Sequence, residues 1–463
     1  MTAQTNTDSS DLTQYGDSIT AVEPGGVERV PESARHGTPL QLLWTWASPN
    51  LEFATIYVGI IAVLFFGLSL PMAVLAVTLG NATGAITHGV LSSWGPRAGV
   101  PQMILSRSAF GFRGNVLPAG LNAVMAGIGW FAVNSVSGAL ALSALTDLSA
   151  KVSLVIIVLA ELVVGFFGHN LVHAFERVAF PLLVIVFTLG AISVFGQADL
   201  GAPGNGPGFG GFTLAFSAAF GYAAGWNPYA SDYTRYLPTS TSRRKTALYA
   251  GGGNFVSCTL LMTVGAAAAS AGTIGNDNPV GDLTGMMPGW IGNLVLLGIA
   301  LGAVSANALN VYSAAVSFLA MGISLPLSLR RAIVALGFGA VGFVLAWNGL
   351  ADAGHKYEAF LLVIAYWIAP WLGVVLTDRW LRRGAALDGI IEDPSYVNLA
   401  GPVAMLVAMV VSVWLFCNQE KYVGPLASAS VGDLTPVVGF GLAVGFYAGL
   451  FQLLKPARPT SLP

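Results

Sequence analysis

Trp130 and Asn134 stand four residues apart in an uncharged stretch of the sequence. In a helix this spacing places both side chains on one face, so an indole ring lies beside an amide that donates and accepts hydrogen bonds. Stacking a base on an aromatic ring contributes about 1–3 kcal/mol, and the amide can read the ring's edge. The pair predicts a site for a planar heterocycle. The alternative is a lipid-facing tryptophan beside an asparagine that bonds another helix.

A second polar group lies among small residues between positions 303 and 313. Its members are Ser305, Asn307, Asn310 and Ser313. Small residues allow close helix packing, and polar side chains are costly in lipid unless they turn inward. They are expected to line the same cavity, with ordinary polar bonding between helices as the alternative.

Two apolar stretches are interrupted by proline beside polar residues or glycine: Ser48-Pro49-Asn50 and Gly225-Trp226-Asn227-Pro228. Proline removes a backbone donor and clashes with the preceding turn, and glycine adds backbone freedom. Unwound segments of this kind expose backbone groups to substrate or ion in transporters built from repeats. A simple proline kink facing lipid is the alternative at either site alone.

The composition identifies the environment that must hold these segments. Hydrophobic residues make up 55% of the 463-residue chain, charged residues make up 9%, and the mean hydropathy is +0.71. The chain is predicted to be an all-α integral membrane protein whose main partner is the lipid bilayer. A net charge of −2 argues against nucleic-acid binding. No obligate protein partner, metal site or cofactor is indicated.

A span needs about 20 mostly apolar residues, and twelve candidates satisfy this requirement. They are Leu40–Ser69, Pro71–Ser93, Leu117–Leu145, Val152–Gly168, Val178–Gly196, Gly211–Ala230, Thr246–Gly272, Trp290–Leu319, Ala332–Leu350, Ala359–Thr377, Leu399–Cys417 and Val437–Leu454.

The charges support this division because cytoplasmic loops collect Lys and Arg. With the N-terminus inside, seventeen of the 20 Lys and Arg residues fall on the inner side and three, Lys151, Lys356 and Lys421, on the outer side. Both termini are therefore expected in the cytoplasm, and the protein in the plasma membrane. Residues 1–38, polar and without a signal peptide, are expected to form a disordered tail, with a short second tail at 456–463.

The spacing of the polar sites suggests an internal repeat. Pro49 precedes Trp130 by 81 residues, and Pro228 precedes Asn310 by 82. The transporter domain at 39–455 is thus divided into repeat one (about 40–196), repeat two (about 211–377) and two extra helices (about 399–454). Paired helix interruptions favour a gated central site, hence a secondary transporter. A channel or a non-transporting receptor is the alternative, and no constellation of catalytic residues indicates an enzyme.

Four segments resemble motifs of one family. They read WASPN (46–50), GPRAGVPQM (95–103), GWFAVN (129–134) and ASDYTRYLP (230–238). In this order they resemble the purine-cytosine permease branch of the nucleobase-cation symporter family.

The resemblance implies a five-plus-five inverted-repeat, LeuT-like core with broken helices 1 and 6. It implies import of a nucleobase such as cytosine, adenine, hypoxanthine or guanine. The alternative is a transporter of the same fold that carries another planar heterocycle, namely allantoin, a hydantoin, uracil, thiamine or pyridoxine. By motif match Trp130 stacks on the ring and Asn134 bonds its edge, with Gly225 and Trp226 on the opposite side. Ser48, Asn50, Asn307 and Asn310 complete the implied site, with either asparagine of the last pair as the contact.

The coupling ion is expected to be H⁺, with Na⁺ as the alternative. Sodium-using relatives carry two adjacent hydroxyl residues on helix 8, whereas here Ser305 is followed by Ala306. Acids inside a membrane are costly and are candidates for proton coupling, which points to Glu161 and Glu176. For Glu176 a structural ion pair with the adjacent Arg177 is the alternative.

Overall fold

A computed structural model describes residues 26–167, 169–275, 278–323, 327–383 and 387–454; the side chains of residues 165–179, 327–335 and 388 lie outside this description. The first half of the chain forms η1 (Glu32–Ala34), α2 (Gln41–Ala47), η2 (Ser48–Asn50), α3 (Phe53–Leu64), α4 (Leu70–Ser92), α5 (Gly95–Ala98), α6 (Gln102–Leu105), α7 (Arg107–Gly114), α8 (Val116–Val124), η3 (Met125–Trp130), α9 (Phe131–Thr146), α10 (Ala150–Phe167), α11 (His169–Phe195), α12 (Phe209–Ala224), η4 (Asn227–Tyr229) and α13 (Ala230–Thr234).

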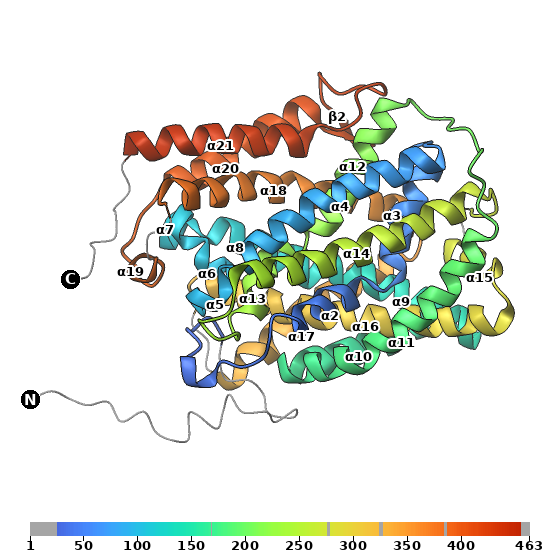
Figure 1. Ribbon diagram of the computed structural model, residues 1–463, viewed down its shortest axis with the longest axis horizontal. Coiled ribbons are helices and arrows are strands. Elements are labelled where there is room, and N and C mark those ends of the chain that lie inside the picture. The colour runs from blue at the N-terminus through green and yellow to red at the C-terminus, as the bar shows by residue number, and fades with distance from the viewer. Residues whose placement is uncertain (1–25, 168, 276–277, 324–326, 384–386, 455–463) are drawn as a thin grey trace, which may run out of the picture.

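The second half forms α14 (Arg243–Ser270), α15 (Pro279–Gly285), α16 (Gly289–Ala320), α17 (Leu327–Gly349), α18 (Ala353–Leu381), α19 (Asp388–Ile391), α20 (Ala400–Phe416), β1 (Asn418–Gln419), β2 (Tyr422–Val423) and α21 (Thr435–Leu454). The two short strands pair antiparallel. The long helices run side by side along the long axis of the molecule (Figure 1).

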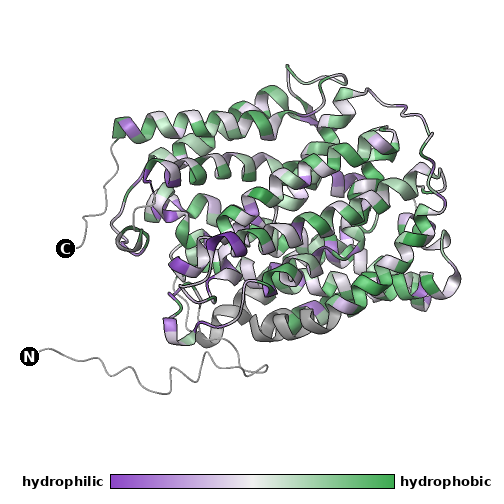
Figure 2. Ribbon diagram, in the orientation of Figure 1, coloured by the Kyte–Doolittle hydropathy of each residue, from purple (hydrophilic) through white to green (hydrophobic). Residues whose placement is uncertain are grey.

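The twelve apolar stretches predicted from the sequence fall largely within helical segments, although some, such as Leu40–Ser69 and Leu117–Leu145, are each divided among three segments. Among the described residues, six helices are long and apolar enough to cross a membrane, and a seventh span arises if the bent pair Gln41–Asn50 and Phe53–Leu64 is one span. Apolar residues dominate the middle of the bundle, and hydrophilic residues gather toward its ends (Figure 2). The chain is thus a mostly helical protein with several membrane-spanning helices.

The long helices pack in two groups. In the first, α4 packs against α12 and α14, and α14 also packs against α2 and α3. In the second, α9, α10, α16 and α17 pack against one another. The helices α20 and α21 pack together and against α18 along one edge of the bundle (Figure 1). The interrupted segment η2 contacts α14 of the first group and α16 of the second, so it lies where the two groups meet.

Glycines allow α3 and α14 to cross at backbone distance. A Cβ at Gly265 would lie 1.8 Å from the Ile56 carbonyl oxygen, and one at Gly59 would lie 1.8 Å from the Met262 carbonyl oxygen. Because the obstructing atoms belong to the backbone, a side-chain rotation cannot relieve the overlap. The closeness of this crossing therefore depends on the absence of both Cβ atoms.

Residues 26–38, part of the predicted disordered tail, pack against residues 95–101 and against Arg235, which follows α13, at one end of the helical bundle. The Val30 N–H donates to the Gly99 carbonyl at 2.9 Å, and its side chain is 2% exposed. Arg35 donates to the Pro96 carbonyl, and Arg235 donates to the Gly26 carbonyl at 2.9 Å. The prediction of disorder is wrong for residues 26–38 because carbonyls of the 95–101 turn bind this segment; residues 1–25 lie outside the described range.

We predict that Gly265→Ala destabilises the protein by about 1–3 kcal/mol, the usual range for overpacking a close contact. The new Cβ overlaps the Ile56 carbonyl and forces α3 and α14 apart. The measurement is the thermal unfolding midpoint of the purified protein in detergent. Gly252→Ala is the matched control on the same helix, because a Cβ there meets no atom within 4 Å. Equal midpoints for the two variants would contradict the prediction.

Candidate functional site

The first long helix is interrupted between Ala47 and Phe53. Pro49 lies within the turn η2, Glu52 has extended backbone angles (φ −155°, ψ 171°), and the axes of the two halves differ by 60°. The Asn50 carbonyl, freed by the break, accepts from the Thr55 hydroxyl at 2.6 Å and from the Glu52 N–H at 2.9 Å. Side chains and local turns thus satisfy backbone groups that the proline removes from the helical pattern.

A second interruption follows α12. Gly225 and Trp226 separate the end of this helix from η4, which contains Pro228, and α13 continues at Ala230. The Gly225 N–H still bonds the Gly221 carbonyl at 3.0 Å, so the departure from helix begins after this residue.

Asn50 connects the two interrupted helices. Its Nδ2 donates to the Trp46 carbonyl at 2.8 Å and to the Ser257 hydroxyl at 3.0 Å. Its Oδ1 accepts from Trp226 Nε1 at 2.8 Å. The amide is fully buried, and its donor and acceptor are both engaged by protein groups. In this conformation Asn50 positions Trp226 and the first break.

The predicted asparagines on α9 and α16 form one cluster. Asn134 Nδ2 and Asn310 Nδ2 both donate to Asn307 Oδ1, at 3.0 and 3.1 Å. Asn307 Nδ2 donates to the Phe131 carbonyl at 2.9 Å, and Asn310 Oδ1 accepts from the Tyr229 hydroxyl at 3.2 Å. Asn134 Oδ1 is buried and accepts no hydrogen bond. This oxygen is therefore available to a hydrogen-bond donor on a ligand.

Trp130 lies at the end of η3, a π-helical turn within the long helix Val116–Thr146. Its ring meets Tyr222 and Phe360 edge-to-face, each with centroids 5.2 Å apart, and Tyr357 at 6.4 Å. A Cβ at Gly225 would lie 3.3 Å from its Cζ2 atom, so the second break passes close to the indole. Local π-helical turns are frequent at functional sites.

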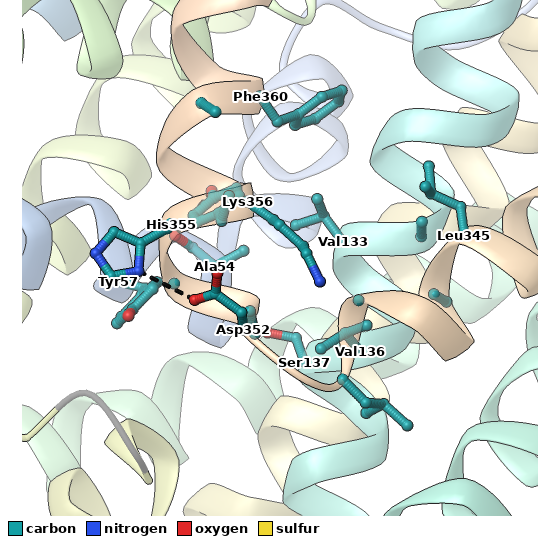
Figure 3. A pocket seen from close by; sticks show the side chains of 18 of the residues that line it. Ala54, Tyr57, Val133, Val136, Ser137, Leu345, Asp352, His355, Lys356 and Phe360 are labelled. Carbon is teal, nitrogen blue, oxygen red and sulfur yellow. Dashed lines mark hydrogen bonds and ion pairs between the residues drawn. The ribbon is translucent and has the colours of Figure 1, made fainter. Parts of the chain in front are cut away.

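A cavity of about 840 Å³ is lined by Phe360, one of the rings that meet Trp130 (Figure 3). Its walls come from α3, α9, α17 and α18 and include Phe53, Val133, Tyr357 and Phe360, with Asp352, His355 and Lys356 at one side. His355 Nδ1 and Asp352 Oδ1 are 3.0 Å apart. Trp130 does not line the cavity, but the two rings that it touches on α18 do. In this conformation Tyr357 and Phe360 contact both the cavity and the indole.

The remaining predicted residues are distributed around this centre. Ser48 Oγ is buried without a hydrogen-bond partner, and Ser305 is buried on α16. Glu161 Oε2 accepts from the Ser135 hydroxyl at 2.6 Å, and Asn307 Nδ2 approaches the same hydroxyl at 3.3 Å. The side chain of Glu176 lies outside the described residues. Among those described, no cluster of three His, Cys, Asp or Glu residues is arranged to hold a metal ion.

Glu52 and Tyr222 are absent from the predicted set. Glu52 Oε1 accepts from the Tyr222 hydroxyl at 3.0 Å, and the carboxyl is 1% exposed. The signal was present in the sequence, because Glu52 is the sole charged residue between positions 40 and 69. An acid inside an apolar span is a candidate for function.

Comparison with known proteins gives consistent relatives over nearly the whole chain. Residues 29–439 match the family described as permeases for cytosine/purines, uracil, thiamine and allantoin. The purine-cytosine permease fcyB of Emericella nidulans is 29% identical over 477 residues, which cover 96% of this chain and 92% of that protein. The purine-cytosine permease FCY2 of Saccharomyces cerevisiae is 27% identical over 465 residues, covering 94% and 86%.

The fold is shared with a solved transporter. The structure of Mhp1, a nucleobase-cation-symport-1 family transporter in a closed conformation with bromovinylhydantoin bound, covers 91% of this chain and 93% of its own. The TM-score is 0.72 at 19% sequence identity. The fold and the family match define a multi-pass membrane transporter and not an enzyme. The chain belongs to the nucleobase-cation symporter family of permeases for cytosine/purines, uracil, thiamine and allantoin.

The cavity predicts a difference in reactivity between two positions on α9. Val133→Cys places a thiol on the cavity wall, whereas Ala139→Cys on the same helix places one at a fully buried position. A hydrophilic maleimide should label the first variant much faster in the purified protein. The native Cys258 and Cys417 are both buried and give a low background. Equal labelling rates at the two positions would show that the cavity does not admit water-soluble reagents.

Proposed function

We propose that this protein imports a nucleobase by cation-coupled symport with alternating access. The observation that carries the proposal is the packing of Gly225, at the second helix interruption, and of the cavity-lining ring of Phe360 against Trp130, one helical turn from the unpartnered Asn134 Oδ1. Cytosine and purines such as adenine, hypoxanthine and guanine are the proposed substrates, because fcyB and FCY2 are named purine-cytosine permeases.

The proposed membrane arrangement has twelve spans, with broken helices 1 and 6 in a five-plus-five core and two additional C-terminal helices. The helical segments that coincide with the twelve apolar stretches of the sequence and the 60° bend after Asn50 support it. Repeat one covers about 40–196, repeat two about 211–377 and the extra helices about 399–454. The excess of Lys and Arg on one side supports cytoplasmic termini in a plasma-membrane protein.

Recognition is proposed to combine stacking and hydrogen bonding. The base stacks on Trp130 after Phe360 moves off the indole, and Trp226 closes the opposite side. Asn134 Oδ1 accepts from an N–H group on the edge of the base, while Asn307 holds the Asn134 amide in place. Both Asn307 and Asn310 are hydrogen-bonded within the protein, and Asn307, which bonds Asn134 directly, is proposed as the nearer of the two to the substrate. Ser48, with a free buried hydroxyl beside the first break, offers a further contact.

The proposed coupling ion is H⁺. Two adjacent hydroxyls are lacking at positions 305 and 306, which disfavours a sodium site that would need several oxygen ligands. Buried carboxyl groups lie near the site instead: Glu161 is bonded to Ser135, which contacts Asn307. Glu161 is thus one candidate for binding the proton.

The proposal is tested by uptake of radiolabelled cytosine into proteoliposomes under imposed proton or sodium gradients. Adenine, hypoxanthine, uracil, allantoin and thiamine serve as unlabelled competitors. Saturable cytosine uptake that purines inhibit supports the proposed substrates, and the driving gradient identifies the ion. Uptake of allantoin or thiamine in place of cytosine would move the substrate to another branch of the family. Failure with every compound would contradict transport of this substrate class.

We predict that Trp130→Ala weakens cytosine binding by about 5- to 150-fold, the equivalent of losing about 1–3 kcal/mol of stacking. The half-saturation concentration for uptake measures the change, with membrane expression checked in parallel. Trp414→Ala is the matched control, because this indole is 59% exposed on the outer surface of α20. Normal uptake by the Trp130 variant would remove the stacking role.

Asn134→Ala is predicted to change the competition profile. The substitution removes the free Oδ1 acceptor and the bond to Asn307, and each lost hydrogen bond contributes about 0.5–1.5 kcal/mol, or about 2- to 13-fold in affinity. Inhibition constants for the five competitors measure the effect. Asn122→Ala is the control, because this amide on α8 donates to the Ser317 hydroxyl on α16 and is not part of the proposed recognition site. An unchanged profile for Asn134→Ala excludes a recognition role.

A further inference from the structure

Glu52 occupies the turn at which the first long helix resumes. It is the residue immediately before α3, and its neighbours Phe53 and Ala54 line the cavity. One carboxyl oxygen, Oε1, accepts from the Tyr222 hydroxyl, while Oε2 is buried and accepts no hydrogen bond. A buried polar atom without a partner in a native protein calls for an explanation, and an unbound ligand or proton is one.

The groups around this carboxyl come from several elements, and none of them is a cation. The titratable groups that interact with it electrostatically are Tyr222 on α12, Cys258 on α14, Tyr357 on α18 and Glu161 on α10. Within the described part of the chain, Glu52 makes no ion pair. An ionised carboxylate is costly at a buried position without a cation, so this site favours the neutral acid when it is closed to water.

The carboxyl is connected to the proposed substrate site by one side chain. The Tyr222 hydroxyl contacts Glu52, and the ring of the same tyrosine meets Trp130 edge-to-face. Thr55 bonds both the Tyr222 hydroxyl and the Asn50 carbonyl. On α16, a Cβ at Gly302 would lie 2.9 Å from the Glu52 Cβ, so a glycine there makes room for the acid. Glu52 therefore lies between the break in the first long helix, the ring of Trp130 and α16.

We infer that Glu52 carries the coupling proton and contacts the edge of the substrate base. The inference rests on the proposed nucleobase transport. A protonated carboxyl has one donor and one acceptor, whereas an ionised carboxylate has acceptors only. Cytosine and adenine present an amino N–H beside a ring nitrogen that accepts, an edge that only the protonated acid matches in both bonds. Base and proton then occupy the site together.

The proton balance is simple. An O–H bond forms at Glu52 when water in the open cavity supplies a proton, and the same bond breaks when the site reaches water on the other side. The base is released unchanged. Closing the site around the ionised acid alone is unfavourable because the charge has no cation beside it. The empty carrier therefore returns with the carboxylate hydrated and bonded to the Tyr222 hydroxyl, while the base binds only the protonated acid, which links each transported base to one proton.

Glu52→Gln tests this assignment, because the amide keeps one donor and one acceptor but cannot release a proton. We expect exchange of internal for external radiolabelled cytosine to continue at a rate that no longer depends on pH. We expect accumulation driven by a proton gradient to fall to a concentration ratio of about one. Glu420→Gln is the matched control, since this acid lies on the exposed turn between β1 and β2; both activities should stay at the wild-type level.

The outcomes separate the proposals from each other. Wild-type protein without saturable uptake overturns the proposed function itself. Proton-driven uptake in the wild type that persists in Glu52→Gln overturns only the role of Glu52, and its loss in Glu161→Gln instead would assign the proton to Glu161. Uptake driven by sodium alone also overturns the inference.

A second variant covers the case in which Glu52→Gln exchanges no cytosine. Tyr222→Phe keeps the carboxyl but removes the hydroxyl that donates to it, which disfavours the ionised form. The pH at which uptake is half-maximal should therefore be higher in this variant than in the wild type. An unchanged half-maximal pH would overturn the inference.

Discussion

The Asn50 amide satisfies the groups that two helix breaks leave without partners, and the arrangement of the site depends on it. In a membrane interior a free backbone carbonyl or indole N–H finds no water, so each must bond within the protein. One side chain meets this requirement on both broken helices, through the Trp46 carbonyl and Trp226 Nε1. The two breaks are thereby held at a fixed separation, opposite Trp130 and the asparagine cluster.

The two ends of the bundle differ in packing. At one end the cavity reaches Tyr357 and Phe360 beside the site. At the other, Arg235 donates to the Tyr312 hydroxyl and to the Gly26 carbonyl, and residues 26–38 pack over the helix ends. A bundle with a cavity at one end and sealed packing at the other is what the proposed alternating-access cycle requires of one of its states. The two packed groups of helices provide bodies that can move relative to each other in such a cycle.

Local patterns in the sequence were sufficient to locate most of the helical segments and to predict that several candidate residues lie close together inside the bundle. Helical spacing predicts Trp130 and Asn134 on one helix face, and the cost of polar groups in lipid predicts that Asn307 and Asn310 point into the protein. All four side chains are buried, and the three asparagines are joined by hydrogen bonds. What the sequence did not reveal depends on long-range geometry. The hydrogen bonds by which Asn50 joins the two breaks were not predictable, because its partners Ser257 and Trp226 are 207 and 176 residues away in the sequence. Glu52 was overlooked because its importance depends on Tyr222 and on the lack of a nearby cation.

The segment that seals one end of the bundle has a consequence for biosynthesis. Arg29 bonds the Ala98 carbonyl and forms an ion pair with Glu392, 363 residues later in the chain. The ribosome must therefore deliver everything up to α19 before this contact exists. Most contacts of residues 26–38 are to residues 95–101 and to Arg235 and Tyr236, so their partners are made by about the middle of translation. The Arg29–Glu392 pair is added only after α19 has been made, so the segment is tied to the second half of the polypeptide late in assembly.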